Sequence, residues 1–149
     1  MIGMRYVSFD LGDKRTGVAA GDDVTGIVTP LQVIEILRAG PAHDRLLGAM
    51  LVIIQSQKPD AIVFGLPLNM DGTEGTPAKV ARQVGEALAK RSSLPVHFQD
   101  ERLTSYAADQ AMAQTGRTHK QKKQLRDALA AAEILRDFLD SHSPGHARG

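Results

Sequence analysis

The sequence predicts an α/β domain in which a mixed β-sheet is flanked by helices. Three strand-like segments come first along the 149-residue chain, and helical and strand-like segments alternate after them. An opening meander followed by such alternation is typical of a layered α/β fold. The length corresponds to one domain, because domains usually contain about 100 to 200 residues. We expect residues 1–140 to form this domain and residues 141–149 to form a flexible C-terminal tail.

The first three strands are predicted from alternating polarity and from turn residues. Residues 6–10 alternate apolar and polar side chains, and Gly12, Gly17 and Gly21 punctuate the residues that follow. This predicts a strand over 5–11, a turn and a second strand over 16–20. We expect these two strands to form a hairpin. Residues 29–37 are rich in Val, Ile and Leu and predict a third strand, although so short an apolar run also fits a helix.

Helices and strands alternate in the rest of the chain. Apolar residues recur at helical spacing from Leu46 to Ile54, and residues 61–66 are an apolar run typical of a strand buried on both faces. The remaining predicted elements are a helix from Thr76 to about Lys90, with Thr76 as its cap and Pro77 in its first position, a strand over 94–98, a helix from Thr104 or Ser105 to Gly116, and a helix over 121–139.

Composition excludes several classes of protein. The chain has no cysteine, which rules out disulfides, thiolate zinc sites, iron–sulfur clusters and thiol nucleophiles. Its longest apolar run, residues 49–54, is far shorter than the roughly 20 residues of a membrane-spanning helix. The N-terminus also lacks the apolar stretch of a secretory signal. We therefore expect a cytoplasmic protein with no membrane partner.

Three acidic residues stand where an α/β sheet places its ligands. Asp10 is near the end of the first predicted strand, and Asp100 and Glu101 follow the last predicted strand. Ligands of open α/β sheets bind outside the carboxyl ends of the strands. If these two strands are parallel, as their helical connections favour, the acids emerge at one edge of the sheet.

A fourth acid, Asp127, heads an apolar stripe on the last predicted helix. At about 100° per residue, Ala131, Ile134 and Phe138 fall on its side of the helix axis. A carboxylate buried without a partner is strongly unfavourable, so Asp127 must meet a cation, a metal ion or solvent at the edge of the sheet. The alternative is that Asp127 only stabilises the N-terminus of a helix.

Carboxylates without cysteine or a histidine cluster suit a hard cation. Mg²⁺ and Mn²⁺ take oxygen ligands and are commonly held by one or two carboxylates together with substrate phosphate. Such ions catalyse phosphodiester hydrolysis by activating water and stabilising the leaving oxygen. Each acid taken alone is more often a solvated surface charge, and only their joint placement favours a metal site.

A basic segment precedes Asp127, although the net charge of the whole chain is only +1. Five cations and no acid lie between Asp109 and Asp127: Arg117, Lys120, Lys122, Lys123 and Arg126. Beside an acidic metal site, such a segment would bind the phosphates of a nucleic acid. The alternative is a solvated start of a helix.

Four segments, in this order, resemble the YqgF/RuvX family: FDLGDKRTGVA at 9–19, VFGLPLNMDGTEG at 63–75, DERLTS at 100–105 and DALAAAEIL at 127–135. The resemblance extends over nearly the whole chain, up to about residue 140. It implies an RNase H-like fold with a five-stranded mixed sheet and helices on both faces. It also implies a nuclease that processes the 5′ end of pre-16S rRNA in ribosome biogenesis, or a Holliday-junction resolvase.

The resemblance also implies roles for individual residues. Asp10 matches the first-strand acid, Glu101 the acid of the DER motif and Asp127 the acid of the last helix, so these three would be catalytic and would hold Mg²⁺ or Mn²⁺. Asp100 is the alternative to Glu101, because neighbouring strand residues point to opposite faces. The residues expected to bind nucleic acid are Arg15, Arg102, Lys120, Lys122, Lys123 and Arg126. For Arg15 and Arg102 the alternative is a structural ion pair with a carboxylate.

Three functions stay open at the level of sequence. The first is a metal-dependent endonuclease on structured RNA, associated with a ribosomal precursor. The second is a resolvase of branched DNA, which needs two cuts related by two-fold symmetry. The third is a nucleic-acid-binding module without catalysis, whose binding would weaken with salt but need no metal. The sequence does not indicate the oligomeric state or a role for the loop from Gly65 to Gly75.

Overall fold

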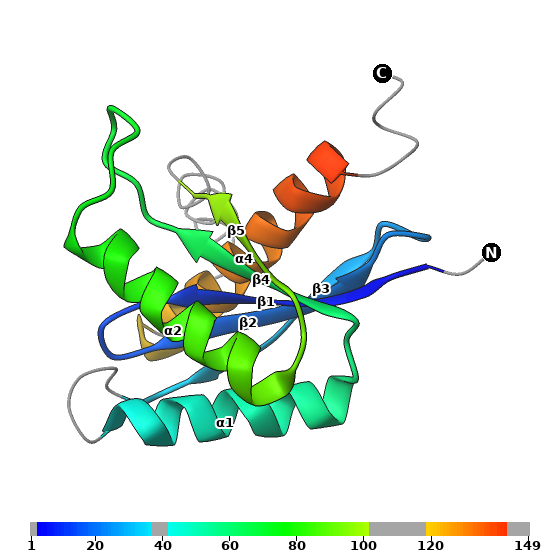
Figure 1. Ribbon diagram of the computed structural model, residues 1–149, viewed down its shortest axis with the longest axis horizontal. Helices are drawn as coiled ribbons and strands as arrows, with labels where there is room; N and C mark the ends of the chain where they lie inside the picture. Colours follow the sequence, from blue (N-terminus) through cyan, green and yellow to red (C-terminus); the bar gives the residue numbers. More distant parts are fainter. Residues whose placement is uncertain (1–2, 37–41, 102–118, 143–149) are drawn as a thin grey trace.

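One mixed sheet and three helices make up the part of the chain that the computed structural model describes, residues 3–36, 42–101 and 119–142 (Figure 1). The strands are β1 (Arg5–Leu11), β2 (Thr16–Asp22), β3 (Val28–Ile34), β4 (Ala61–Leu66) and β5 (Val96–Asp100). The helices are α1 (Ala42–Gln57), α2 (Thr76–Ser92) and α4 (His119–His142).

The strand order in the sheet is β3-β2-β1-β4-β5. β1 pairs with β2 and β2 with β3 in antiparallel fashion, whereas β1, β4 and β5 are parallel. This confirms the predicted mixed sheet with an opening antiparallel meander. Because β1, β4 and β5 are parallel, their carboxyl ends lie at the same edge of the sheet, as the positions of Asp10 and Glu101 predicted.

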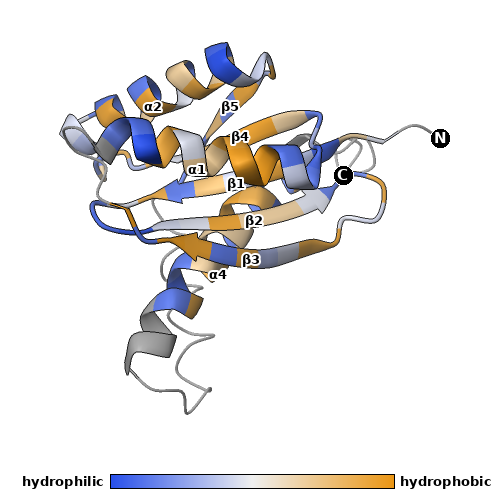
Figure 2. Ribbon diagram, turned by 90° about the horizontal axis from the view of Figure 1, so that it is seen from below, coloured by the Kyte–Doolittle hydropathy of each residue, from blue (hydrophilic) through white to orange (hydrophobic). Residues whose placement is uncertain are grey.

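The helices cover both faces of the sheet. α1 and α2 lie on one face, and α4 crosses the other (Figures 1 and 2). Each interface is a separate apolar cluster. The cluster under α1 and α2 contains Phe9, Leu46 and Phe64, and the cluster under α4 contains Val63 and Ile134.

Alternation along β1 decides which residues face α4. Val7 and Phe9 are buried in the cluster with α1 and α2, and Tyr6 is buried with α4. Ser8 also points to α4, because its hydroxyl donates a hydrogen bond of 2.7 Å to the carbonyl of Ala131. The next residue on this side of the strand is Asp10. The strand period of two therefore brings the Asp10 carboxylate between the sheet and α4.

The predicted bounds of β1 and β4 are confirmed, whereas those of other elements differ. β2 ends at Asp22 rather than at residue 20, and β3 runs from Val28 to Ile34 rather than over 29–37. β5 runs from Val96 to Asp100 rather than over 94–98. The parallel pairing of β4 with β5, which aligns Ile62 with Val96, decides where β5 starts. Register with a neighbouring strand is a long-range property, so a short apolar run does not reveal it.

Helix ends differ from the prediction as well. Gly75, not Thr76, caps α2, and it makes no side-chain hydrogen bond to the first turn. α4 continues to His142, so the first two residues of the predicted tail are helical. The predicted helix from Thr104 or Ser105 to Gly116 and residues 143–149 lie outside the described residues. Within the described part of the chain, no helix is long and apolar enough to cross a membrane.

Candidate active site

Asp10 is flanked by a glycine on each neighbouring strand. In the antiparallel pair β1–β2 its partner is Gly17. In the parallel pair β1–β4, Phe9 aligns with Phe64, so Gly65 is the next residue of β4 beside Asp10. Neither neighbour has a side chain on the α4 face. Groups from other elements can therefore lie above both glycines, on either side of the Asp10 carboxylate.

Glu101 reaches this space from the end of β5. Its backbone amide donates to the carbonyl of Leu66 at 3.3 Å, which extends the pairing of β4 with β5 by one step. Its side chain is hydrogen-bonded to the side chain of Asp10. Since Phe98 packs on the α1–α2 side of the sheet, alternation also directs Asp100 to that side and Glu101 toward α4. Of the two neighbouring acids, Glu101 is the one that meets Asp10.

Burial is the main cause that raises the pKa of both carboxyl groups. Burial raises the pKa of Asp10, the hydrogen bond from Glu101 lowers it, and the charge of Asp127 raises it. Burial and then the charge of Asp10 raise the pKa of Glu101 to about 9, with smaller contributions from their hydrogen bond and from Asp100. At neutral pH Glu101 therefore keeps its proton and donates it in the hydrogen bond to the Asp10 carboxylate.

Asp127 lies near this pair but is bound to Arg15. The Nε of Arg15 donates to Oδ2 of Asp127 at 2.7 Å, with side-chain exposures of 34% and 23%. Asp127 is in the third turn of α4, which begins at His119. The alternative reading, that this acid stabilises a helix N-terminus, is therefore wrong, because the helix dipole acts within the first turn.

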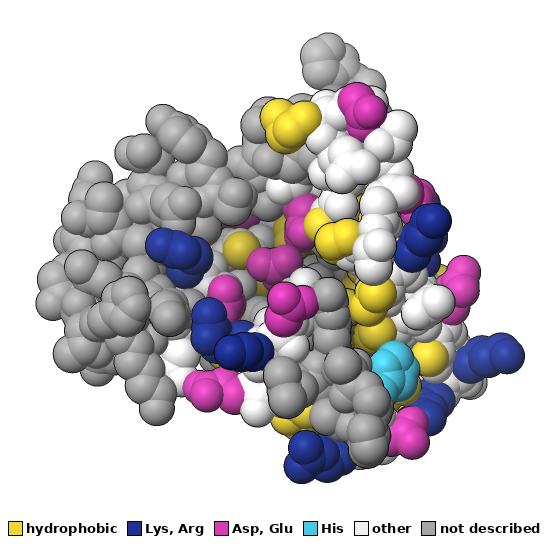
Figure 3. Space-filling model, turned by 90° about the vertical axis from the view of Figure 1, so that its left-hand side faces the viewer, with side chains coloured by type: hydrophobic (Ala, Val, Ile, Leu, Met, Phe, Trp, Pro, Cys, Tyr) yellow, Lys and Arg dark blue, Asp and Glu magenta, His cyan; other side chains and the backbone are white. Residues whose placement is uncertain are grey.

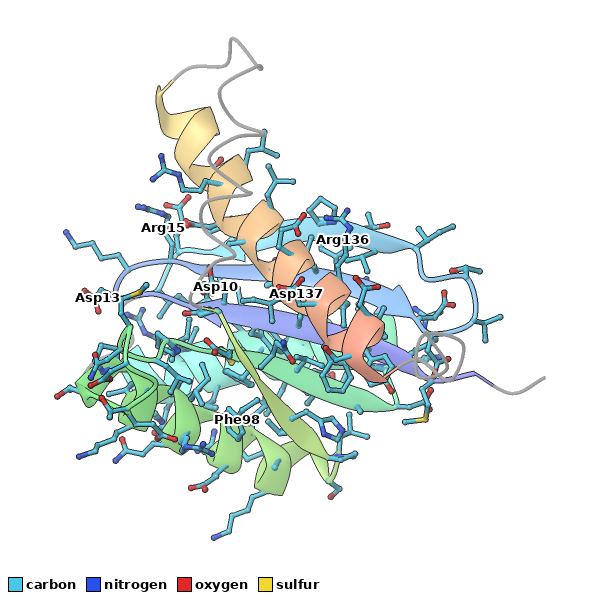
Figure 4. All side chains as sticks on the ribbon, turned by 90° about the horizontal axis from the view of Figure 1, so that it is seen from above. Asp10, Asp13, Arg15, Phe98, Arg136 and Asp137 are labelled. Atoms are coloured by element: carbon cyan, nitrogen blue, oxygen red, sulfur yellow. The ribbon has the colours of Figure 1, made fainter. Side chains whose placement is uncertain are left out.

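Gly17 allows the backbone of α4 to lie directly on β2. A Cβ atom added at Gly17 would overlap the backbone carbonyl of Asp127 and would lie 3.2 Å from the backbone nitrogen of Ala128. The backbone of α4 therefore rests on the bare backbone of β2. This contact brings the Asp127 side chain to the edge where β1 ends. In Figure 4, Asp10 and Arg15 both lie beside the N-terminal half of α4.

Of the three predicted acids, Asp10 and Glu101 are hydrogen-bonded to each other, and Asp127 lies near them. In residues 3–36, 42–101 and 119–142, no group of three or more His, Asp or Glu side chains is arranged to hold a metal ion. The donor chemistry of the Asp10–Glu101 pair nevertheless fits a hard divalent cation, which is commonly held by one or two carboxylates plus substrate phosphate. Asp127 stays a candidate third ligand whose carboxylate is bound to Arg15.

The predicted phosphate-binding residues are described only in part. Arg126 is exposed, and Arg15 makes the ion pair that was its alternative role. Arg102 and the side chains of Lys120, Lys122 and Lys123 lie outside the described residues. Acidic side chains gather near the centre of the face where β1, β4 and β5 end, and Lys and Arg side chains lie beside them (Figure 3).

Sequence reasoning missed Gly17 and Gly65 as residues that shape this site. From the sequence, Gly17 indicates only a turn, and Gly65 only the start of a loop. The available signal was that each glycine lies inside a strand-like segment, where glycine often marks a close approach of another group. The sequence does not reveal which group lies against each glycine, because that depends on how β1, β2 and β4 pair.

Solved structures of Holliday-junction resolvases share this architecture. One is the Thermus thermophilus RuvC in complex with a Holliday junction substrate, with a TM-score of 0.58 and 14% identity over 95% of this chain and 96% of that chain. Another is the fowlpox virus Holliday junction resolvase, with a TM-score of 0.60 and 14% identity over 93% of this chain and 99% of that chain. The fold is therefore the RNase H-like fold of these resolvases.

Sequence comparison narrows this class to one family. The family model RuvX, described as Holliday junction resolvase, matches residues 4–141. A relative from Dechloromonas aromatica named "Putative pre-16S rRNA nuclease" is 40% identical over 135 residues, which are 91% of this chain and 90% of the relative. A relative of the same name from Agathobacter rectalis is 38% identical over 138 residues, 92% of this chain and 95% of the relative. The chain belongs to the RuvX (YqgF) family.

Proposed function

We propose that the protein is a divalent-metal-dependent endonuclease that cleaves phosphodiester bonds near the 5′ end of pre-16S rRNA in the cytoplasm. The observation that carries the proposal is the pairing of Asp10 with Glu101 at the shared carboxyl edge of β1 and β5. Support for the substrate comes from the names of the relatives in Dechloromonas aromatica and Agathobacter rectalis.

In this proposal Asp10 and Glu101 hold the cation, with Asp127 as a third ligand. A bound Mg²⁺ or Mn²⁺ would activate water and stabilise the charge that develops on the leaving oxygen. Glu101 must give up its proton for this purpose, because metal ligands bind as carboxylates. In this proposal the Asp10 carboxylate, which accepts a hydrogen bond from Glu101 in the structure, is the second ligand.

Basic side chains around the pair would orient the RNA. Arg15 lies in the turn between β1 and β2, which is closed by a hydrogen bond of 3.0 Å from the Gly12 amide to the Arg15 carbonyl. Lys14 in the same turn and Arg126 on α4 are exposed. Cations beside the carboxylate pair would attract the phosphates of the RNA. Arg15 has the further role of holding Asp127 in place.

The test is replacement of Asp10 by Asn. An RNA that spans the 5′ end of 16S rRNA and its leader is incubated with the purified protein and Mg²⁺ or Mn²⁺. We expect the variant to lose at least about 100-fold in cleavage rate, because the ligand charge is removed while the shape is kept. The control is Asp44→Asn, an exposed acid on α1, on the far face of the sheet. Wild-type cleavage by Asp10→Asn would contradict the proposal.

A second candidate function is resolution of four-way DNA junctions, which the description of the family model favours. Resolution needs two symmetric cuts, so it requires a dimer on the junction. Incubating the protein with a four-way junction, together with sedimentation analysis of its oligomeric state, tests this candidate. Cleavage of the junction but not of the rRNA precursor would select it over the first function.

A nucleic-acid-binding module without catalysis is the remaining alternative. It predicts salt-dependent binding without turnover, and equal binding by wild type and Asp10→Asn in the absence of metal. Metal-dependent cleavage by the wild type that is lost in Asp10→Asn would eliminate it.

A further inference from the structure

Asp10 and Glu101 do not lie on neighbouring strands. β4 lies between β1 and β5 in the sheet. Neighbouring strands are about 4.8 Å apart, so the backbones that carry the two acids are separated by roughly 10 Å. The hydrogen bond between the carboxyl groups must therefore form above β4. The size of the β4 side chain between the two acids, on the α4 face, therefore decides whether this bond can form.

Gly65 is the residue of β4 at that position. It follows Phe64, the partner of Phe9 in β1, and it pairs with Gln99 in β5. A Cβ atom added at Gly65 would overlap Oε2 of Glu101 and would lie 3.1 Å from its Cδ. The Glu101 carboxylate thus occupies the volume that any side chain at this position would fill.

The backbone conformation does not require glycine at this position. Gly65 lies in the regular strand β4, and the glycines with positive φ in the described residues are Gly26 and Gly72. An alanine could adopt the strand conformation of Gly65 without backbone strain. The reason for a glycine here is therefore the space above it.

Other glycines of the chain have different neighbours. A Cβ at Gly17 would meet the backbone of α4, and one at Gly85 would meet the ring of Phe98. A Cβ at Gly48 on α1 would meet nothing within 4 Å. Among the described glycines, Gly65 is the one whose space is taken by a candidate catalytic carboxylate.

We propose that Gly65 is a positioning residue of the active site: its missing side chain is the opening through which Glu101 crosses β4 to meet Asp10. The inference rests on the proposed function, because it assigns the pair of carboxylates to one cation. It makes Gly65 a determinant of metal affinity although Gly65 offers no ligand atom. Residues that orient metal ligands commonly change affinity by about 10- to 100-fold when they are replaced.

The experiment compares Gly65→Ala with variants that separate carboxylate placement from packing. The added methyl group would also lie 2.5 Å from Cδ1 of Ile134 on α4. Ile134→Val removes this atom, so Gly65→Ala combined with Ile134→Val keeps only the conflict with Glu101. Ile134→Val alone is the reference for the double variant, and Gly48→Ala is the control for adding a methyl group to a glycine elsewhere.

Mn²⁺ binding is measured by calorimetry, and folding by the melting temperature in EDTA. We expect Gly65→Ala to lower Mn²⁺ affinity by about tenfold or more, both alone and with Ile134→Val. Gly48→Ala and Ile134→Val should bind Mn²⁺ like the wild type. The melting temperature of the double variant should be close to that of Ile134→Val. Equal Mn²⁺ affinity of the double variant and Ile134→Val would overturn the inference.

A crystal structure of the double variant without metal keeps this test separate from the proposed function. If the wild type neither binds Mn²⁺ nor cleaves RNA, the proposed function fails, and the position of Glu101 still tests the role of Gly65. We expect the Glu101 carboxylate to be displaced from Asp10 in that structure. An unchanged hydrogen bond between Asp10 and Glu101 would show that Gly65 is not needed to position them.

Discussion

At the scale of single residues, burial and the charge of Asp10 raise the pKa of Glu101. Glu101 has a pKa of about 9 in the folded chain, against an ordinary value of 4.5. Between these two pH values the folded chain holds a proton that the unfolded chain has released. The folded state therefore binds more protons, and the free energy of unfolding must fall as the pH rises through this window.

Glu101→Gln should remove this pH dependence, because an uncharged amide has no proton to lose. In EDTA at pH 8, we expect the variant to be more stable than the wild type by about 1 to 3 kcal/mol. Urea denaturation at pH 6 and pH 8 measures the difference. The control is Glu86→Gln on the exposed side of α2. If Glu101→Gln and the wild type lose stability in parallel between the two pH values, the raised pKa of Glu101 is wrong.

Arg15 makes an ion pair with Asp127 near the Asp10–Glu101 pair. Its ion pair with Asp127 is partly exposed, at 34% and 23%. Pairs of this kind contribute less than about 1 kcal/mol to stability, because water screens them. A loss of RNA affinity on removal of Arg15 would therefore come from a lost phosphate contact and not from unfolding.

Arg15→Gln should change RNA affinity more than stability. We expect the melting temperature to fall by only a few degrees. The slope of log affinity against log salt concentration should become shallower by about one, the contribution of one phosphate contact. Fluorescence anisotropy with a labelled precursor RNA at several salt concentrations measures this slope. The control is Arg91→Gln, which breaks the exposed ion pair with Asp44 at the far end of α2. An unchanged slope for Arg15→Gln would assign Arg15 to the fold alone.

At the scale of elements, the position of α4 on the sheet depends on Gly17. The helix backbone at Asp127 and Ala128 lies against β2 where a side chain at position 17 would stand. Neighbouring backbone atoms cannot move aside as a flexible side chain can. α4 carries both Asp127 and apolar residues of the cluster beneath it, such as Ile134, so its displacement would affect the site and the core together.

Gly17→Ala should destabilise the protein by about 1 to 3 kcal/mol, the usual cost of an added methyl group in a tightly packed contact. Gly48→Ala is the matched control with the opposite expected sign. It lies in the exposed part of α1 with open space around it, and alanine favours helix over glycine by up to about 1 kcal/mol. Urea denaturation measures both variants. A Gly17→Ala variant as stable as the wild type would show that α4 adapts without cost.

Local pattern predicted the elements with unequal success. The alternation of Arg5–Leu11 and the apolar run Ala61–Leu66 predicted β1 and β4 to the residue. Both strands lie inside the sheet, where burial leaves a strong hydrophobic signal. β3 and β5 are edge strands with weaker patterns, and their ends depend on pairing with β2 and β4.

At the scale of the whole molecule, three layers bring distant segments to one edge of the sheet. Asp10, Glu101 and Asp127 are far apart in the sequence, yet β1, β5 and α4 converge where the parallel strands end. Crossovers through α1 and α2 keep β1, β4 and β5 parallel, and parallel strands present their carboxyl ends together. The site follows from this topology more than from any single motif.

The sequence alone determined the fold class, the order of the strands along the chain and the identity of the acids at the edge of the sheet. Those features follow from local periodicity, and from motifs that resemble one family. Only the tertiary structure decided that Glu101 rather than Asp100 meets Asp10, that Arg15 binds Asp127, and that Gly17 and Gly65 leave room for these contacts. The physical reason is that each of these contacts joins residues far apart in the chain, whose distance depends on strand register and helix packing.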